Sequence, residues 1–80
     1  MEVHTMDELI KEVPELVEKI EQATENLGSF YFTMYGSHKS TTSRIDEKYK
    51  SAIHGWCKHY GYRFDELHDF YHTFKISKIY

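Results

Sequence analysis

The stretch from residue 43 to residue 62 constrains the fold most, because it shows the clearest helical period in this chain of 80 residues. Its apolar and aromatic side chains recur at intervals of three and four, which places them on one face of a helix. Ser43 and Asp46 form a weak version of a capping box, and Gly61 is a usual left-handed helix stop. We therefore expect a central helix that starts at Ser43 and ends at Tyr60. Its apolar face comprises Ile45, Tyr49, Ala52, Ile53, Trp56 and Tyr60.

A second helical stripe runs from residue 9 to residue 27. Thr5 and Glu8 form a capping box before it, and Gly28 follows its end. Pro14 interrupts the stripe, because proline lacks an N–H group and clashes with the preceding turn. The chain either kinks at Pro14 or starts a second helix there, and we favour one kinked helix. The stripe comprises Leu9, Ile10, Val13, Leu16, Val17, Ile20, Ala23, Thr24 and Leu27.

Residues 29–35 alternate strictly between two sets of side chains, which predicts a β-strand. One face would carry Phe30, Phe32 and Met34, and the other face would carry Tyr31, Thr33 and Tyr35. Residues 75–80 contain β-branched side chains and no helix stop, so we expect a second strand that pairs with the first.

Between the central helix and the last strand, Asp65 suits the N-cap of a short helix. The apolar face of that helix would contain Leu67, Phe70, Tyr71 and Phe74. The predicted fold class is therefore α+β, a single domain over residues 1–80. Two main helices and one short helix would pack on a two-stranded sheet, in the order helix, strand, helix, helix, strand. A homodimer that joins sheet edges would extend this thin sheet, although nothing in the sequence requires one.

We expect the hydrophobic core to combine the apolar faces of these elements. Its predicted members are Leu9, Val13, Val17, Ile20, Phe30, Phe32, Ile45, Tyr49, Ile53, Trp56, Leu67, Phe70 and Phe74.

The net charge of −3 conceals an uneven distribution of charge along the chain. Residues 1–28 carry eight acidic and two basic side chains, whereas residues 29–80 carry five acidic and eight basic ones. The first part is thus acidic and the second mildly basic, so the domain can present two different faces. The single Cys excludes an internal disulfide and fits a reducing compartment. Because neither a membrane-spanning run nor a signal pattern is present, we expect a cytoplasmic protein with no membrane partner.

Metal binding and nucleophilic catalysis have only weak signals. His68 and His72 are four apart and His54 and Cys57 are three apart, but no CxxC or HExxH spacing occurs. Cys57 would lie in the middle of a helix, where a free cysteine is usually a buried small hydrophobic residue. We therefore predict no catalytic residue, no metal ligand and no cofactor, and read these residues as structural.

A nucleic-acid interface has more support from the sequence. The polar loop with His38 and Lys39 leads into Arg44 and Lys48, and basic side chains near a helix N-terminus suit phosphate. Tyrosines on the outer strand face could stack on bases. The predicted contact surface for nucleic acid or a protein partner comprises Tyr31, Tyr35, His38, Lys39, Arg44 and Lys48.

A protein partner is the alternative. A small domain that is rich in tyrosine and carries both acidic and basic surfaces also suits an inhibitor that blocks a host or defence enzyme, as anti-CRISPR-type proteins do. Phosphate contacts weaken steeply as salt rises, whereas an aromatic protein interface should weaken far less.

One family resemblance bears on this choice. Five segments carry it: Ser43–Glu47 leading into Tyr49, then Trp56, then Gly61 with Tyr62, then Asp65–His68, then Phe74 with Lys75. Over roughly residues 40–75, the chain resembles small phage recombination-accessory proteins of the NinB type. The resemblance implies contact with single-stranded DNA and a role in phage recombination. Together these observations predict a non-catalytic, phage-type binding module that contacts nucleic acid or a protein that processes it.

Overall fold

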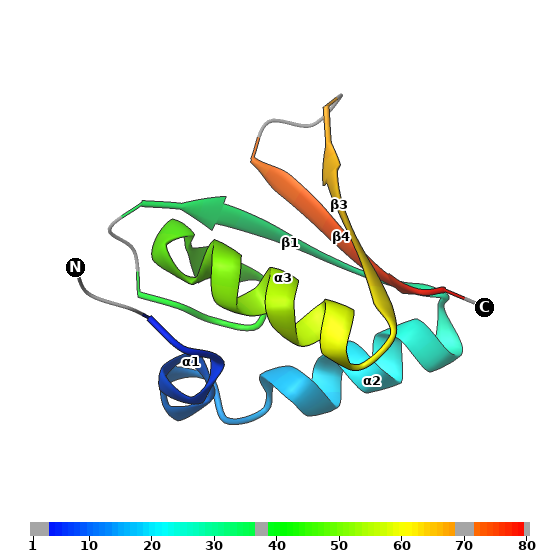
Figure 1. Ribbon diagram of the computed structural model, residues 1–80, viewed down its shortest axis with the longest axis horizontal. Coiled ribbons are helices and arrows are strands. Elements are labelled where there is room, and N and C mark those ends of the chain that lie inside the picture. The colour runs from blue at the N-terminus through cyan, green and yellow to red at the C-terminus, as the bar shows by residue number, and fades with distance from the viewer. Residues whose placement is uncertain (1–3, 37–38, 69–71, 80) are drawn as a thin grey trace.

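A computed structural model describes residues 4–36, 39–68 and 72–79. Within these residues, three α-helices and one 3-10 helix pack on a four-stranded mixed sheet (Figure 1), so the predicted α+β class is confirmed. None of the helices in this part of the chain is long and apolar enough to cross a membrane. The elements are α1 (Met6–Glu12), α2 (Leu16–Asn26), β1 (Ser29–Tyr35), β2 (Arg44–Asp46), η1 (Glu47–Tyr49), α3 (Lys50–His59), β3 (Tyr62–Leu67) and β4 (Thr73–Lys78).

The sheet has the strand order β2-β1-β4-β3, so the predicted two-stranded sheet is wrong. The predicted pairing of the first strand with the C-terminal strand is confirmed: β1 lies antiparallel to β4, with Phe32 opposite Phe74. Strand β3 pairs antiparallel with β4, and the short β2 pairs parallel with β1. The two added strands therefore lie at the two edges of the predicted pair.

Strand β3 occupies residues where the sequence predicts the start of a short helix. Tyr62 and Phe64 pack against the core, while the intervening Arg63 is exposed, which is the period of a strand. All six residues of β3 pair with β4, and these ladder bonds outweigh the helical spacing that begins at Asp65. The predicted helix residues Phe70 and Tyr71 lie outside the described residues.

The central helix begins later than predicted. Residues 44–46 form β2 instead, because they pair with β1, and α3 begins at Lys50. Asp46 caps η1 rather than a long helix, since its Oδ1 accepts a hydrogen bond from the Lys48 N–H at 3.1 Å. The helix end is as predicted, with Gly61 in the left-handed region at φ 77°.

The N-terminal segment is two helices rather than one kinked helix. The predicted N-cap is confirmed, because Thr5 Oγ1 accepts a hydrogen bond from the Glu8 N–H at 3.3 Å. Helix α1 ends at Glu12 and α2 begins at Leu16, with Pro14 in the turn between them. The proline removes a donor that a continuous helix would need.

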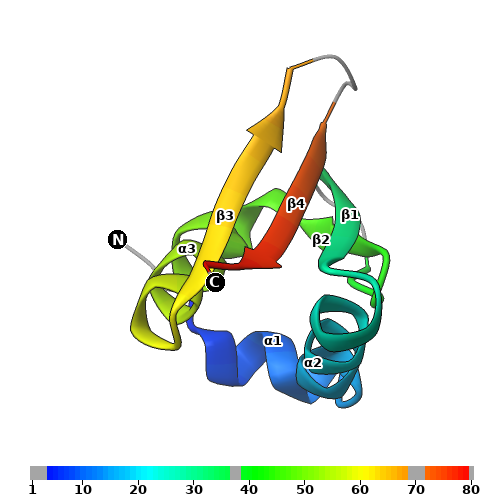
Figure 2. The same ribbon diagram turned by 90° about the vertical axis from the view of Figure 1, so that its right-hand side faces the viewer.

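One hydrophobic core joins the three helices to a single face of the sheet (Figure 2). Eight of the predicted core residues are buried: Leu9, Val13, Ile20, Phe32, Ile45, Tyr49, Ile53 and Phe74. Four others are only partly buried, namely Val17, Phe30, Trp56 and Leu67. The core also contains four residues that the prediction omits, namely Leu16, Met34, Cys57 and Ile76. Phe70 lies outside the described residues.

Gly61, which follows the central helix, and Gly55, which lies within it, should respond oppositely to substitution by alanine. Gly61 has a positive φ of 77°, and a Cβ there would meet nothing within 4 Å, so its alanine variant reports backbone strain alone. We expect Gly61→Ala to lower the free energy of unfolding by about 1 kcal/mol. Gly55 lies within α3 and is equally open, so Gly55→Ala should raise that free energy by about 0.5 to 1 kcal/mol. Urea unfolding measures both, and a change of the same sign in both variants would contradict the assigned helix end.

Candidate nucleic-acid interface

None of the described elements covers the sheet face opposite the helices (Figure 2). Because side chains of a strand alternate between its two faces, Phe32 and Met34 of β1 point into the core. Tyr31, Thr33 and Tyr35 therefore point away from the helices. The strand registers place side chains from all four strands on this second face. We call it the open sheet face; it comprises Tyr31, Thr33, Tyr35, Arg44, Asp46, Arg63, Asp65, Leu67, Thr73, Lys75 and Ser77.

Two exposed tyrosines on β1 each lie beside a cation. Tyr31 is 55% exposed, and Lys75 Nζ lies 6.0 Å from its ring centroid. Tyr35 is 38% exposed; Arg44 Cζ lies 5.9 Å from its ring centroid and the His72 ring lies 5.3 Å away. Four residues of strand separate the two tyrosines by about 13 Å. The open sheet face thus presents two exposed aromatic rings, each with a cation lying over it in a cation–π contact.

Hydroxyl groups of the preceding loop fix the position of Arg44. The Arg44 N–H donates to Thr41 Oγ1 at 3.2 Å, and the Thr41 N–H donates to the Arg44 carbonyl oxygen at 2.6 Å. The neighbouring Ser43 carbonyl oxygen accepts a hydrogen bond from the Thr33 N–H of β1 at 3.0 Å. The two bonds with Thr41 fix the backbone of Arg44, and the bond from Thr33 joins this segment to β1. The guanidinium group of Arg44 therefore lies next to Tyr35.

Two carboxylates on the open sheet face are engaged by close neighbours. Asp65 Oδ2 lies 3.1 Å from Arg63 Nε, in an ion pair between residues two apart on the same strand. Asp46 accepts the hydrogen bond from the Lys48 N–H that caps η1. The carboxylates of Asp46 and Asp65 thus accept hydrogen bonds from neighbouring residues, while Arg44 and Lys75 lie against the aromatic rings.

The structure brings together part of the predicted contact surface. Tyr31, Tyr35 and Arg44 share the open sheet face, and Lys39 is exposed in the loop that precedes β2. Lys48 lies elsewhere, because its Nζ is 5.2 Å from the ring of Tyr49, which packs in the core. His38 lies outside the described residues.

Sequence reasoning missed Lys75 as a contact residue. Its place opposite Tyr31 depends on the register between β1 and β4. The sequence predicts that the two segments pair, but alternation within each strand does not determine which residues lie opposite each other. Lys75 could therefore not be placed next to Tyr31 from the sequence.

The described residues contain no group of three or more His, Cys, Asp or Glu side chains placed to hold a metal ion. His68 and His72 do not share a helix, since His68 follows β3 and His72 precedes β4. Cys57 is fully buried, and this burial raises the pKa of its thiol to about 12. The reactive thiolate is therefore scarce at neutral pH, and the geometry supports a structural role for Cys57.

Comparison with known proteins finds no matching family model, no similar curated protein and no similar solved structure.

The buried thiol predicts a loss of stability at alkaline pH. The pKa of Cys57 rises from its ordinary value of 9.0 to about 12, so between these values the unfolded chain loses a proton that the folded chain keeps. The stabilising contribution is complete below pH 9 and is lost as pH rises towards 12. Burial and the Glu12 carboxylate raise the pKa of Tyr49 to about 12 as well, so this residue acts in the same direction.

We expect the Cys57→Ala variant to lose less stability than the wild type when pH rises. Between pH 7 and about pH 10.5, the difference between the two losses should be about 1 to 2 kcal/mol, since Tyr49 is common to both proteins. Urea unfolding at each pH measures it. Parallel losses in the two proteins would show that the thiol ionises as readily in the folded chain as in the unfolded one.

Proposed function

We propose that the protein is a small non-catalytic binding module whose open sheet face binds single-stranded nucleic acid. The observation that carries the proposal is the pairing of each exposed tyrosine on β1 with a cation, Tyr31 with Lys75 and Tyr35 with Arg44. Proteins that bind single strands combine aromatic side chains, on which bases stack, with basic groups that follow the phosphates.

The chemistry of each pair suits one nucleotide. The exposed tyrosine ring offers a surface for base stacking, which is worth about 1 to 3 kcal/mol per base. The adjacent Arg44 guanidinium can bind a phosphate through two parallel hydrogen bonds, while Lys75 acts as a point charge. Thr33 lies between the two tyrosines on β1, opposite Thr73 of β4, and its hydroxyl donates a hydrogen bond to the Ser43 carbonyl oxygen at 3.3 Å.

The shape and charge of the face favour single strands over duplex DNA. A sheet face with exposed rings offers no helix or ribbon for the major groove, and stacking requires bases that are not paired. With Arg44 and Lys75 as the cations beside the rings, about two phosphates would be contacted. The logarithm of the binding constant should then fall with the logarithm of salt concentration with a slope of about −1.4.

The proposal includes a phage origin for the protein. The resemblance of residues 40–75 to NinB-type phage proteins supports single-stranded DNA as the ligand, and phage origin stays a prediction. The competing proposal, an inhibitor that binds a host or defence enzyme, would give an interface with little dependence on salt and no affinity for oligonucleotides.

Fluorescence anisotropy with a labelled oligothymidylate of about 15 nucleotides tests the stacking role of Tyr31. We expect Tyr31→Ala to weaken binding by about 1 to 3 kcal/mol, because a stacking platform is lost, and Tyr31→Phe to bind like the wild type. Tyr60→Ala is the matched control: Tyr60 has a similar exposure, 62%, and lies at the end of α3, away from the open sheet face. Equal binding by Tyr31→Ala and Tyr60→Ala, or no binding by the wild type at low salt, would contradict the proposal.

The same assay at salt concentrations from about 50 mM to about 200 mM tests the phosphate contact of Arg44. Arg44→Gln should reduce the slope of the logarithmic salt plot by about 0.7, as expected when one phosphate contact to a single strand is lost. Lys58→Gln removes the same charge from the exposed side of α3 and should leave the slope unchanged. If Lys58→Gln alters the slope as much as Arg44→Gln, the binding is general electrostatic attraction and does not occur at the open sheet face.

A further inference from the structure

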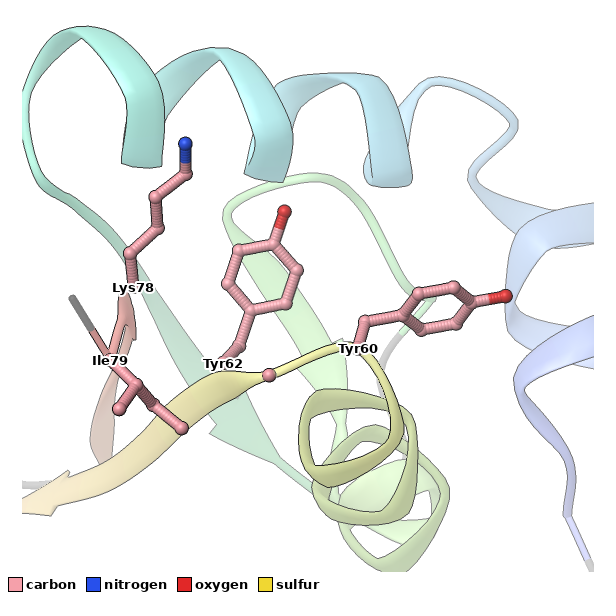
Figure 3. A pocket seen from close by; sticks show the side chains of 5 residues that line it. Tyr60, Tyr62, Lys78 and Ile79 are labelled. Carbon is pink, nitrogen blue, oxygen red and sulfur yellow. The ribbon is translucent and has the colours of Figure 1, made fainter.

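A groove on the helical side of the molecule is separate from the open sheet face. Its larger hollow, of about 300 Å³, lies between the two N-terminal helices and the end of α3; its smaller one, of about 220 Å³, lies beside the end of β4. The two hollows share Tyr60 and Tyr62, so we treat them as one surface, the aromatic groove. In Figure 3, Tyr62 points from β3 towards α2 and Tyr60 points towards α1. The larger hollow is lined by Ile10, Val17, Glu21, Trp56, Tyr60 and Tyr62, and the smaller by Tyr60, Gly61, Tyr62, Lys78 and Ile79.

The aromatic side chains of the groove are held in place by one another. The rings of Trp56 and Tyr62 stack at 5.3 Å with an angle of 9° between their planes, and both pack against the core. The Tyr60 ring lies 5.2 Å from Trp56 and 4.8 Å from His59. Trp and Tyr that are fixed in this way and partly exposed are the side chains that contribute most to protein interfaces, because little conformational entropy is lost on binding.

The wall that α2 contributes to the groove is acidic. Glu21 lines the larger hollow, and the exposed Glu18 and Glu25 lie three and four residues from it along the same helix. Across residues 1–28 the net charge is −6. Lys78 lines the smaller hollow, so the acidic character belongs to the larger hollow, where Glu21 is the charged lining residue. The larger hollow and the open sheet face therefore differ in the ligands that they can bind.

We propose that the aromatic groove is a docking site for a basic segment of a partner protein. An apolar or aromatic side chain of the segment would fill the larger hollow against Val17 and Trp56, and a Lys or Arg would lie against Glu21. Charge complementarity selects this occupant. A two-fold dimer centred on the larger hollow would bring Glu21 and its acidic neighbours of both copies together, which like charges oppose.

A displayed library of random peptides of about twelve residues, selected on the immobilised wild-type protein, tests the proposal. We expect the enriched peptides to combine Lys or Arg with a large apolar residue. Tyr60→Ala, at a side chain 62% exposed, should weaken their binding about tenfold, while Tyr31→Ala, at one 55% exposed, should not change it. Glu21→Lys should weaken binding about tenfold at low salt, whereas Glu47→Lys, the same charge reversal on η1, should leave it unchanged.

Thermal unfolding of each variant, compared with that of the wild type, confirms that a loss of binding is not a loss of fold. Four outcomes would overturn the proposal: no enrichment over uncoated support, enrichment of acidic peptides, equal binding of the enriched peptides to Tyr60→Ala and wild type, or equal binding to Glu21→Lys and wild type. Sedimentation of the wild type as a dimer that Tyr60→Ala dissociates would also overturn it, because a second copy would then occupy the groove.

Discussion

Phe32 lies at the centre of the aromatic contacts that join β1, β3 and β4 on the core face of the sheet. It is buried, it pairs across the strands with Phe74, and its ring centroid lies 5.9 Å from that of Phe30, 5.7 Å from Phe74 and 6.1 Å from Phe64. These aromatic contacts bring β1, β3 and β4 onto one core, and the alternation of a strand then sends Tyr31 and Thr33 to the opposite side. A register slip of one residue would exchange the two faces, so burial of Phe32 fixes the composition of the open sheet face.

The two sides of the molecule therefore differ in chemistry as well as in position. The helices cover the core side; α1 and α2 give their part of it an acidic exterior, whereas α3 carries the exposed Lys50 and Lys58. The open sheet face holds Arg44 and Lys75 beside tyrosines, and its two carboxylates are engaged by near neighbours. A nucleic acid would be repelled by the surface of α1 and α2 and attracted by the cations of the open sheet face, which favours one orientation of the domain as it approaches such a ligand. The proposed protein partner would reach the acidic side and leave the sheet face accessible.

Local patterns in the sequence predict part of this arrangement. The strand at residues 29–35 and its two faces are readable, because strict alternation of aromatic and β-branched side chains has few alternatives. Helix caps at Thr5, Gly28 and Gly61 are readable for the same reason, since each depends on a few adjacent residues. Residues 62–67 fit both the spacing of a helix and the alternation of a strand. They form a strand because they pair with β4, which is a long-range interaction. Strand β2 has only three residues, and it exists because β1 and the hydroxyl groups of the loop bind its backbone.

The residues of the candidate site also divide into those that local patterns predict and those that depend on strand pairing. Tyr31 and Tyr35 could be predicted from alternation, whereas Lys75 required the register between β1 and β4. Arg44 was predicted for a different reason, a helix N-terminus, but it reaches the site through strand pairing. The aromatic groove was not predictable, because its lining comes from α1, α2, α3 and the two strands that follow.

The proposed ligand of the open sheet face is single-stranded nucleic acid. Titration of the isotope-labelled protein with an oligothymidylate, followed by proton–nitrogen correlation NMR, tests this proposal most directly. We expect the backbone amide signals of β1 and β4, those of Tyr31, Tyr35 and Lys75 above all, to shift with increasing ligand, while those of α2 remain in place. Shifts confined to the helices, or an unchanged spectrum at saturating oligonucleotide, would contradict it.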